Sequence, residues 1–396
     1  MKIFMPALGR VNTQNRDGSE VRTTEILKRW LQQGVQVDCL LPKRQVRVFE
    51  SQGLLGLKYQ LLPDPTESES EHLGNVLFLY LTRMVKGMFA SFARDYQVIY
   101  GPSDFLVDLL PALACRSKNP QAKLVVCLFL VAPKPWRGYE GHYSGKLKRP
   151  SLRGLLYYFT QRLAIGLIRG FGGTFLVLNN QDNQALVEAG CRPESVKTVP
   201  MGVDVSLYKA PADQAEPLLD GLFIGRLHPQ KGLPDLLLVW RAVVDQRPGA
   251  KLGIIGGGSE EMKAWLESET RRLGLVENVE YLGFRQGEEK IGYLHRSRCF
   301  LMPSHYESWG MTAVEAMAAG LPVVAYDLPV FREIFPQGMI QVPFTDTGAF
   351  AQKVLELLED PALCTQVGAL SQAFAGQFDW SRVAADEMAI LTAPAP

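Results

Sequence analysis

The sequence lacks long apolar runs and cysteine motifs. No segment offers about 18 uncharged apolar residues, so we expect no transmembrane helix. The apolar run in the opening MKIFMPALG is too short for a signal peptide and predicts a first strand instead. The six cysteines are scattered without CxxC or metal-like spacing, several of them inside apolar runs. This usage is typical of reduced core residues in a cytoplasmic protein.

An excess of charge and the usual cofactor motifs are also absent. Lys and Arg number 42 against 41 Asp and Glu, which argues against a nucleic-acid partner. The five histidines are dispersed and no DxD motif occurs, so we expect no bound metal. The GGG at 256–258 is not a GxGxxG with an acid about 20 residues further on, which excludes a dehydrogenase interpretation. No lysine pattern for pyridoxal phosphate stands out, and we expect no cofactor.

Strands and helices alternate along the chain, with a less regular stretch at 42–75. At 396 residues the protein is long enough for two or three domains, and 47% hydrophobic content suffices for large cores. Alternation predicts parallel sheets covered on both faces. We therefore expect an α/β protein of two doubly wound, Rossmann-like domains, over 1–205 and 215–376, with a linker at 201–214. Two such domains would face each other across a cleft at the carboxyl ends of their strands.

The stretch from Met302 to Asp327 reads as strand, loop, helix and strand. The predicted helix N-terminus would direct free amides at a phosphate, because the helix dipole favours negative charge there; these are the amides of Gly310, Met311 and Thr312. Glu315 is placed to accept hydrogen bonds from a ribose diol, and Glu307 to reach the hydroxyls of a sugar. The alternative is that Glu307 is a solvated loop residue and Glu315 a favourable charge near the helix start.

Two further positions favour phosphate binding. The loop after Ile224 reads GRLHPQKG, in which Arg226 and Lys231 could grip a diphosphate beside Gly225. Two solvated loop cations are the alternative. Gly18, at the mouth of the first helix, would let a ligand approach the backbone, although Gly9 and Gly18 do not form a GxGxxG motif.

Residues 134–169 combine eight basic residues, interleaved aromatics and one acid, Glu140. The part from 151 to 169 has helical character with leucine-rich faces. This combination favours contact with an anionic membrane surface or a lipid-linked acceptor. An ordinary core helix with solvated arginines is the alternative.

Taken together, GRLHPQKG, IIGGGSE, YLGF and PSHYESWGMTAVEAMAAGLPVVA resemble the donor half of a GT-B glycosyltransferase of family 4, the glycosyl transferases group 1. MGVD at 201–204 resembles the family's interdomain NGVD, with Met201 in place of Asn. The closing FDW and helix resemble its C-terminal segment, which implies that 377–396 crosses back to the first domain.

The resemblance implies a retaining glycosyltransferase that moves a sugar from a UDP-, GDP- or ADP-sugar to a hydroxyl acceptor, a glycan, a glycolipid or a small molecule. Arg226 and Lys231 would neutralise the leaving diphosphate. Glu315 would hold the ribose, and Glu307 would contact the transferred sugar. Phe284 lies where such enzymes present backbone to the base. The expected location is the cytoplasm, or peripherally the inner membrane face.

One departure from the family concerns a histidine in the first domain. Many relatives carry it after the strand that corresponds to 124–131, where this sequence reads LVVCLFLVAPKP. Retaining members are thought to use the donor's own phosphate as base, so transfer does not require it; His142 is a candidate replacement. Alternatives are a degenerate sugar-nucleotide-binding or scaffold protein, a sugar-nucleotide epimerase and a phosphorylase.

Overall fold

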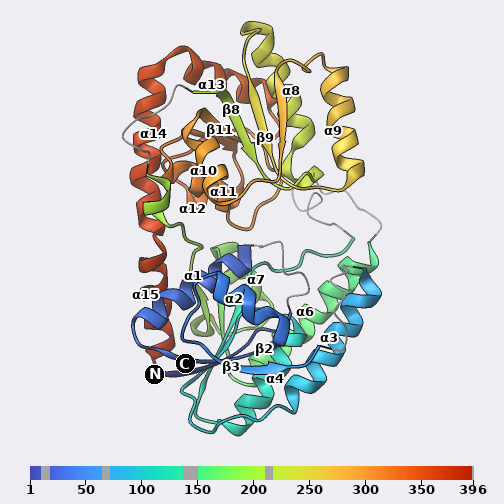
Figure 1. Ribbon diagram of the computed structural model, residues 1–396, viewed down its shortest axis with the longest axis vertical. Helices are drawn as coiled ribbons and strands as arrows, with labels where there is room; N and C mark the ends of the chain where they lie inside the picture. The colour runs from blue at the N-terminus through green and yellow to red at the C-terminus, as the bar shows by residue number, and fades with distance from the viewer. Residues whose placement is uncertain (10–17, 65–71, 137–149, 210–216, 395–396) are drawn as a thin grey trace. The chain divides into compact units, whose positions relative to one another are not determined.

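A computed structural model of the protein describes residues 1–9, 18–64, 72–136, 150–209 and 217–394. Its contacts divide the chain into two compact units (Figure 1). The first unit comprises the described residues up to Met201 together with those from Trp380 onward, and the second runs from Gly202 to Asp379. Each unit is described by itself below.

The first unit is a parallel sheet with helices on both faces. Its seven described strands are ordered β3-β2-β1-β4-β5-β6-β7. The strands are β1 (Lys2–Pro6), β2 (Gln36–Pro42), β3 (Lys58–Leu62), β4 (Val98–Gly101), β5 (Lys123–Leu128), β6 (Thr174–Val177) and β7 (Val196–Thr198). The helices are α1 (Gly18–Gln32), α2 (Val46–Ser51), α3 (Leu73–Met88), α4 (Leu106–Lys118), α6 (Leu152–Gly170), α7 (Asn180–Glu188) and α15 (Trp380–Thr392).

Both faces of this sheet are covered at its centre, which explains why its central strands β4, β5 and β6 are apolar runs. On one face Phe4 belongs to the core that α4 and α6 cover. On the other face the ring of Tyr100 lies 5.3 Å from that of Trp30 on α1. The last helix of the chain, α15, also packs on α1, and the indole nitrogen of Trp30 donates to the Ala384 carbonyl at 3.4 Å.

The second unit repeats the same architecture. Its six described strands are ordered β10-β9-β8-β11-β12-β13, all paired in parallel. The strands are β8 (Leu219–Ile224), β9 (Leu252–Ile255), β10 (Val279–Gly283), β11 (Ser297–Met302), β12 (Val323–Tyr326) and β13 (Ile340–Val342). The helices are α8 (Leu233–Gln246), α9 (Glu260–Arg272), α10 (Gly287–His295), α11 (Met311–Ala318), α12 (Pro329–Ile334), α13 (Thr347–Glu359) and α14 (Pro361–Ala375).

These sheets confirm the predicted fold class of two Rossmann-like α/β domains. The structure adds local elements that the sequence pattern does not predict. The less regular stretch 42–75 contains α2 and the edge strand β3. Within 201–214, predicted to be a linker, Val205–Tyr208 form a 3₁₀ turn whose Tyr208 is buried. Neither α12 nor β13 is predicted, because each is too short to show a periodic pattern.

Candidate active site

Two loops of the second unit leave the same edge of its sheet. β8 and β11 are parallel neighbours, so residues 225–232 after β8 and 303–310 after β11 emerge side by side. The Lys231 ammonium lies 2.5 Å from Oε1 of Glu307. Backbone contacts reinforce this ion pair: the His305 amide donates to the Gln230 carbonyl at 2.9 Å, and the Gln230 side chain donates to the Tyr306 carbonyl at 3.0 Å. The cation and carboxylate predicted from the sequence therefore meet in one place.

Glycines permit this close approach of backbones. Gly232 has φ +68°, and a Cβ there would lie 1.8 Å from the Pro303 carbonyl oxygen. Gly256 has φ +156°, and a Cβ there would lie 1.8 Å from the Gly225 carbonyl oxygen. Neither position has room for any side chain. The glycines of GRLHPQKG and of GGG thus fix the loop that carries Lys231.

Glu307 is buried, with 9% of its surface exposed. It accepts a hydrogen bond from the Ser304 hydroxyl at 2.8 Å as well as from Lys231. The alternative that Glu307 is a solvated loop residue is therefore wrong. An ammonium has three donors, so Lys231 keeps donors for a ligand while its charge balances the carboxylate.

The helix that follows this loop, α11, begins at Met311; its N-cap residue is Gly310 with φ +108°, and no side chain among the described residues caps it. Below its start, Trp309 is buried and its ring contacts those of Phe335 and Phe378 at 5.4 and 5.2 Å. Capping side chains would occupy the first amides of a helix. The backbone amides of Met311 and Thr312 are therefore available to an anionic ligand.

Glu315, one turn into α11, pairs with Lys290 of α10 at 2.7 Å. It also interacts with the Tyr208 hydroxyl, and burial, followed by the charge of Glu315, raises the pKa of Tyr208 well above its ordinary value. The side chain of Glu315 is 13% exposed, so one face stays open to solvent. Sequence reasoning found Glu315 but missed Lys290 and Tyr208, which come from other elements and carry no motif.

A partly buried carboxylate, Asp235 at the start of α8, holds the loop after β11. Its Oδ2 accepts a hydrogen bond from the Tyr326 hydroxyl and is 2.9 Å from Nε2 of His305. The ring of His305 also packs on Phe344 at 5.5 Å. His305 is held through both its backbone and its ring. These contacts fix the part of the loop that carries Glu307. Its position two residues before Glu307 is the only sequence signal for this role.

The remaining predicted donor residues that the structure describes take part in neither of these ion pairs, and each is placed by its own element. Arg226 is exposed on the same loop as Lys231. Phe284 follows β10 and is 53% exposed. Gly18 is the first residue of α1 in the first unit. His142, the candidate replacement for the missing histidine, falls outside the described residues.

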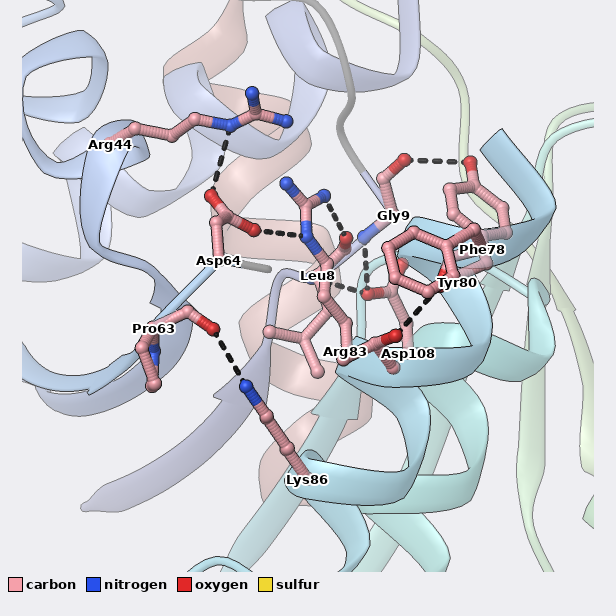
Figure 2. Close-up of polar contacts among 11 residues, drawn as sticks. Leu8, Gly9, Arg44, Pro63, Asp64, Phe78, Tyr80, Arg83, Lys86 and Asp108 are labelled. Atoms are coloured by element: carbon pink, nitrogen blue, oxygen red, sulfur yellow. Dashed lines mark hydrogen bonds and ion pairs between the residues drawn. The ribbon is translucent and has the colours of Figure 1, made fainter. Parts of the chain in front are cut away.

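The first unit holds a polar cluster where β1 ends (Figure 2). The amides of Leu8 and Gly9 donate to Oδ1 of Asp108 at 2.6 and 3.0 Å. Tyr80 donates to the Gly9 carbonyl at 2.6 Å, and Arg83 to the Leu8 carbonyl at 2.9 Å. Burial raises the pKa of Asp108 to about 6. These contacts fix the backbone of Leu8 and Gly9, and no motif in the sequence signals them.

Most of the second unit matches a family model. The model described as "Glycosyl transferases group 1" covers residues 212–372. This stretch is a glycosyl transferases group 1 domain. It contains Lys231, Glu307 and Glu315 with the ion pairs described above.

Curated relatives of the group 1 domain include proteins named as a mannosyltransferase and as a glycogen synthase. A phosphatidyl-myo-inositol mannosyltransferase of Mycobacterium leprae is 35% identical over 48% of this chain and 52% of that protein. A glycogen synthase of Mycobacterium tuberculosis is 31% identical over 41% and 40%. The match thus spans about half, or less, of the length of these relatives. A D-inositol 3-phosphate glycosyltransferase of Catenulispora acidiphila is 26% identical over 92% of this chain and 88% of that protein.

Solved structures extend the likeness beyond the group 1 domain. Anabaena HepE in complex with UDP and glucose has a TM-score of 0.73 at 20% identity, covering 99% of both chains. Sucrose-phosphate synthase of Thermosynechococcus elongatus has the same TM-score at 16% identity, covering 98% of both. At these identities the likeness shows the fold, which is GT-B and confirms the prediction.

Metal-ligand clusters and membrane-spanning helices are both missing from the described part of the chain. Among its residues no group of three or more His, Cys, Asp or Glu side chains could hold a metal ion. None of the helices described above is both long and apolar enough to cross a membrane.

Proposed function

We propose that this protein is a retaining glycosyltransferase that moves a sugar from a nucleoside-diphosphate sugar to an acceptor hydroxyl. The observation that carries the proposal is the Lys231–Glu307 contact of 2.5 Å beside the N-terminus of α11. It puts a cation, backbone amides and a carboxylate suited to sugar hydroxyls around one point. Relatives of the group 1 domain that are named as a mannosyltransferase and a glycosyltransferase support the proposal.

Each group has a part in the reaction. The bond between the anomeric carbon and the donor phosphate oxygen breaks, and the acceptor oxygen bonds to that carbon on the same face. The acceptor proton passes to the departing phosphate. Lys231, Arg226 and the amides of α11 stabilise the charge on the diphosphate, and because they are in place beforehand no reorganisation is needed. Glu307 accepts hydrogen bonds from the sugar.

The nucleoside would be held by groups next to this centre. Glu315 accepts the ribose hydroxyls, with Lys290 and Tyr208 orienting its carboxylate. The backbone near Phe284 contacts the base. Because backbone atoms make this contact, the side chains do not indicate whether the base is uracil, guanine or adenine. The HepE complex with UDP-glucose supports a sugar nucleotide as the donor. We further propose that transfer is independent of metal and continues in the presence of a chelator.

The first test is a thermal-shift panel of UDP-, GDP- and ADP-sugars on the full chain. A donor at 100 times its Kd adds about 2.7 kcal/mol of stability, so one nucleotide class should raise the melting temperature. Lys231→Met should lose that shift, and its turnover should fall at least ~100-fold because one preorganised charge is gone. Glu307→Gln should keep partial donor binding but lose turnover similarly.

Lys263→Met is the matched control, since Lys263 is an exposed lysine on α9 paired with its neighbour Glu260. It should leave both binding and turnover unchanged. Normal turnover in Lys231→Met would refute the site. A donor shift without transfer or donor hydrolysis would identify a sugar-nucleotide-binding scaffold instead. Retention is checked from the anomeric configuration of the product by NMR.

A further inference from the structure

Two helices of the first unit expose large apolar side chains to solvent. On α3, Leu77 (48% exposed), Leu81 (59%) and Val85 (43%) recur every four residues, which places them along one side of the helix. Phe78 (55%) lies beside Leu77 in the sequence, and Phe89 (82%) directly follows the helix. On α6 a similar pattern occurs with Leu152 (62%), Leu156 (37%), Phe159 (61%) and Leu163 (54%). Scattered exposed leucines are ordinary, but two aligned rows on neighbouring helices are not.

The two rows are linked by aromatic contacts. Phe105, just before α4, is 41% exposed. Its ring lies 6.3 Å from that of Tyr80 on α3 and 5.9 Å from that of Tyr157 on α6. Both helices also contact α4, and they run along the same side of this unit (Figure 1). We call α3, Phe105 and α6 together the two-helix surface.

The charges on the two-helix surface have one sign. Neither α3 nor α6 contains an Asp or a Glu. Lys86, Arg153 and Arg162 are exposed on them. Arg162 lies over the ring of Tyr158 at 5.1 Å, and that ring contacts Trp136, which is 43% exposed. Cations beside exposed leucines, with a tryptophan and phenylalanines, are the composition of helices that lie in a membrane interface.

We propose that the two-helix surface docks on an anionic membrane, with its apolar rows in the boundary between headgroups and acyl chains. Charge decides between a membrane and a second copy of the chain: a copy facing this surface would bring like charges together, whereas anionic headgroups complement them. The proposal extends the basic, aromatic segment 134–169 noted in the sequence, of which 137–149 lie outside the described residues. The larger apolar contribution comes from α3, which sequence reasoning passed over.

Sedimentation with vesicles tests this proposal without any turnover, so its result is independent of the proposed function. The full chain should sediment with vesicles of phosphatidylcholine mixed with phosphatidylglycerol and remain in the supernatant with phosphatidylcholine alone. Binding should weaken as salt rises, because mobile ions screen exposed charges. Leu81→Gln combined with Phe159→Gln should weaken binding at least ~10-fold, because apolar area enters the interface with each side chain. Both side chains are more than half exposed, so the melting temperature should stay unchanged.

The matched apolar control is Leu370→Gln on α14, which is 60% exposed and lies in the second unit. The charge variant is Lys86→Gln with Arg162→Gln, and its control is Arg271→Gln, an exposed arginine on α9. Both controls should bind as the wild type does, while the charge variant should bind more weakly and lose most of its salt dependence. The proposal is overturned if no sedimentation occurs with anionic vesicles at low salt. It is equally overturned if the α3 and α6 substitutions convert a dimer to a monomer while vesicle binding is unchanged.

Discussion

Asp108 shows how a single buried carboxyl can make stability depend on pH. Its folded pKa is raised to about 6 from an ordinary 3.8 by burial. Between these values the folded protein holds a proton that the unfolded chain has released, so raising the pH favours unfolding. The Asp108 carboxyl therefore does not lower the free energy of unfolding below about pH 4. Above about pH 6 it lowers that free energy by its full amount. A difference of two pKa units corresponds to at most about 3 kcal/mol.

Asp108→Asn should remove this dependence. The amide oxygen can still accept from Leu8 and Gly9, and the amide nitrogen can donate to Ser103, whose hydroxyl now donates to Oδ2 at 2.5 Å. Denaturant unfolding at pH 4 and pH 7 should show the variant gaining stability relative to the wild type as the pH rises. Asp386→Asn, an exposed carboxyl on α15, should show no such gain. An equal difference at both pH values would show that Asp108 titrates normally.

Site residues that lie in a sequence motif could be predicted. The residues that contact and position them could not. Lys231, Glu307 and Glu315 stand out because loop glycines, a strand end and a helix start surround them. Lys290, by contrast, becomes a partner of Glu315 only when α10 and α11 pack together. Such contacts depend on tertiary placement, which no local spacing encodes. The roles of the predicted residues themselves remain predictions.

At the scale of elements, an ion pair couples α1 to α15. Nη2 of Arg22 lies 2.6 Å from Oε2 of Glu387, and both side chains are almost fully buried. Burial alone would lower the pKa of Arg22, but attraction to Glu387 outweighs it and raises that pKa, so the guanidinium stays charged. Glu387→Leu should destabilise the protein by about 3–5 kcal/mol, because it leaves a buried charge without its partner.

The double variant Arg22→Met with Glu387→Leu should recover most of that loss, since a well-packed apolar pair can replace a buried ion pair. Denaturant unfolding of the wild type, the two single variants and the double variant gives the coupling free energy between Arg22 and Glu387. If the double variant loses as much free energy of unfolding as the two single variants together, the two side chains are not coupled. The exposed pair Arg271–Glu267 on α9 serves as control, for which coupling below about 1 kcal/mol is expected.

Elements longer than a few residues follow from periodicity, with errors at their ends. The helix α3 runs from Leu73 to Met88, and its start is set by His72, which caps it by accepting from the Gly74 amide. The edge strand β3 escapes prediction because only its last residue, Leu62, is buried, and it lacks the apolar run of a central strand. Strand order is set by tertiary pairing, so it could not be predicted from periodicity.

At the scale of the whole molecule, the chain builds its two units differently. The second unit is continuous from Gly202 to Asp379, whereas the first is completed only by α15 after the chain has formed the second. Sequence composition could place the boundary between the two units near residue 201. It could not predict that the last helix, α15, belongs to the first unit. That return was implied by the resemblance alone, because α15 looks like any other amphipathic helix.

This arrangement predicts that fragments of the two units behave unequally. Residues 202–379 carry a whole sheet with the partners of Lys231, Glu307 and Glu315, so this fragment should unfold cooperatively and bind the donor nucleotide weakly. Residues 1–201 alone would expose Arg22 and Trp30, which are 1% and 0% exposed beneath α15 in the full chain. This fragment should aggregate or show no cooperative transition. Circular dichroism melts and analytical gel filtration distinguish the two outcomes.

A permuted fragment supplies the control. Both termini of the chain lie in the first unit (Figure 1), and Lys123 at the start of β5 donates to the Ile390 carbonyl at 2.5 Å. Fusing residues 380–394 ahead of Met1 through a flexible linker should therefore restore the cover over α1 and give a folded monomer. The same fusion with Glu387→Leu should again be unstable, because Arg22 would stay unpaired. If 1–201 alone melts as cooperatively as the fusion, α15 is dispensable and the first unit ends before the second begins.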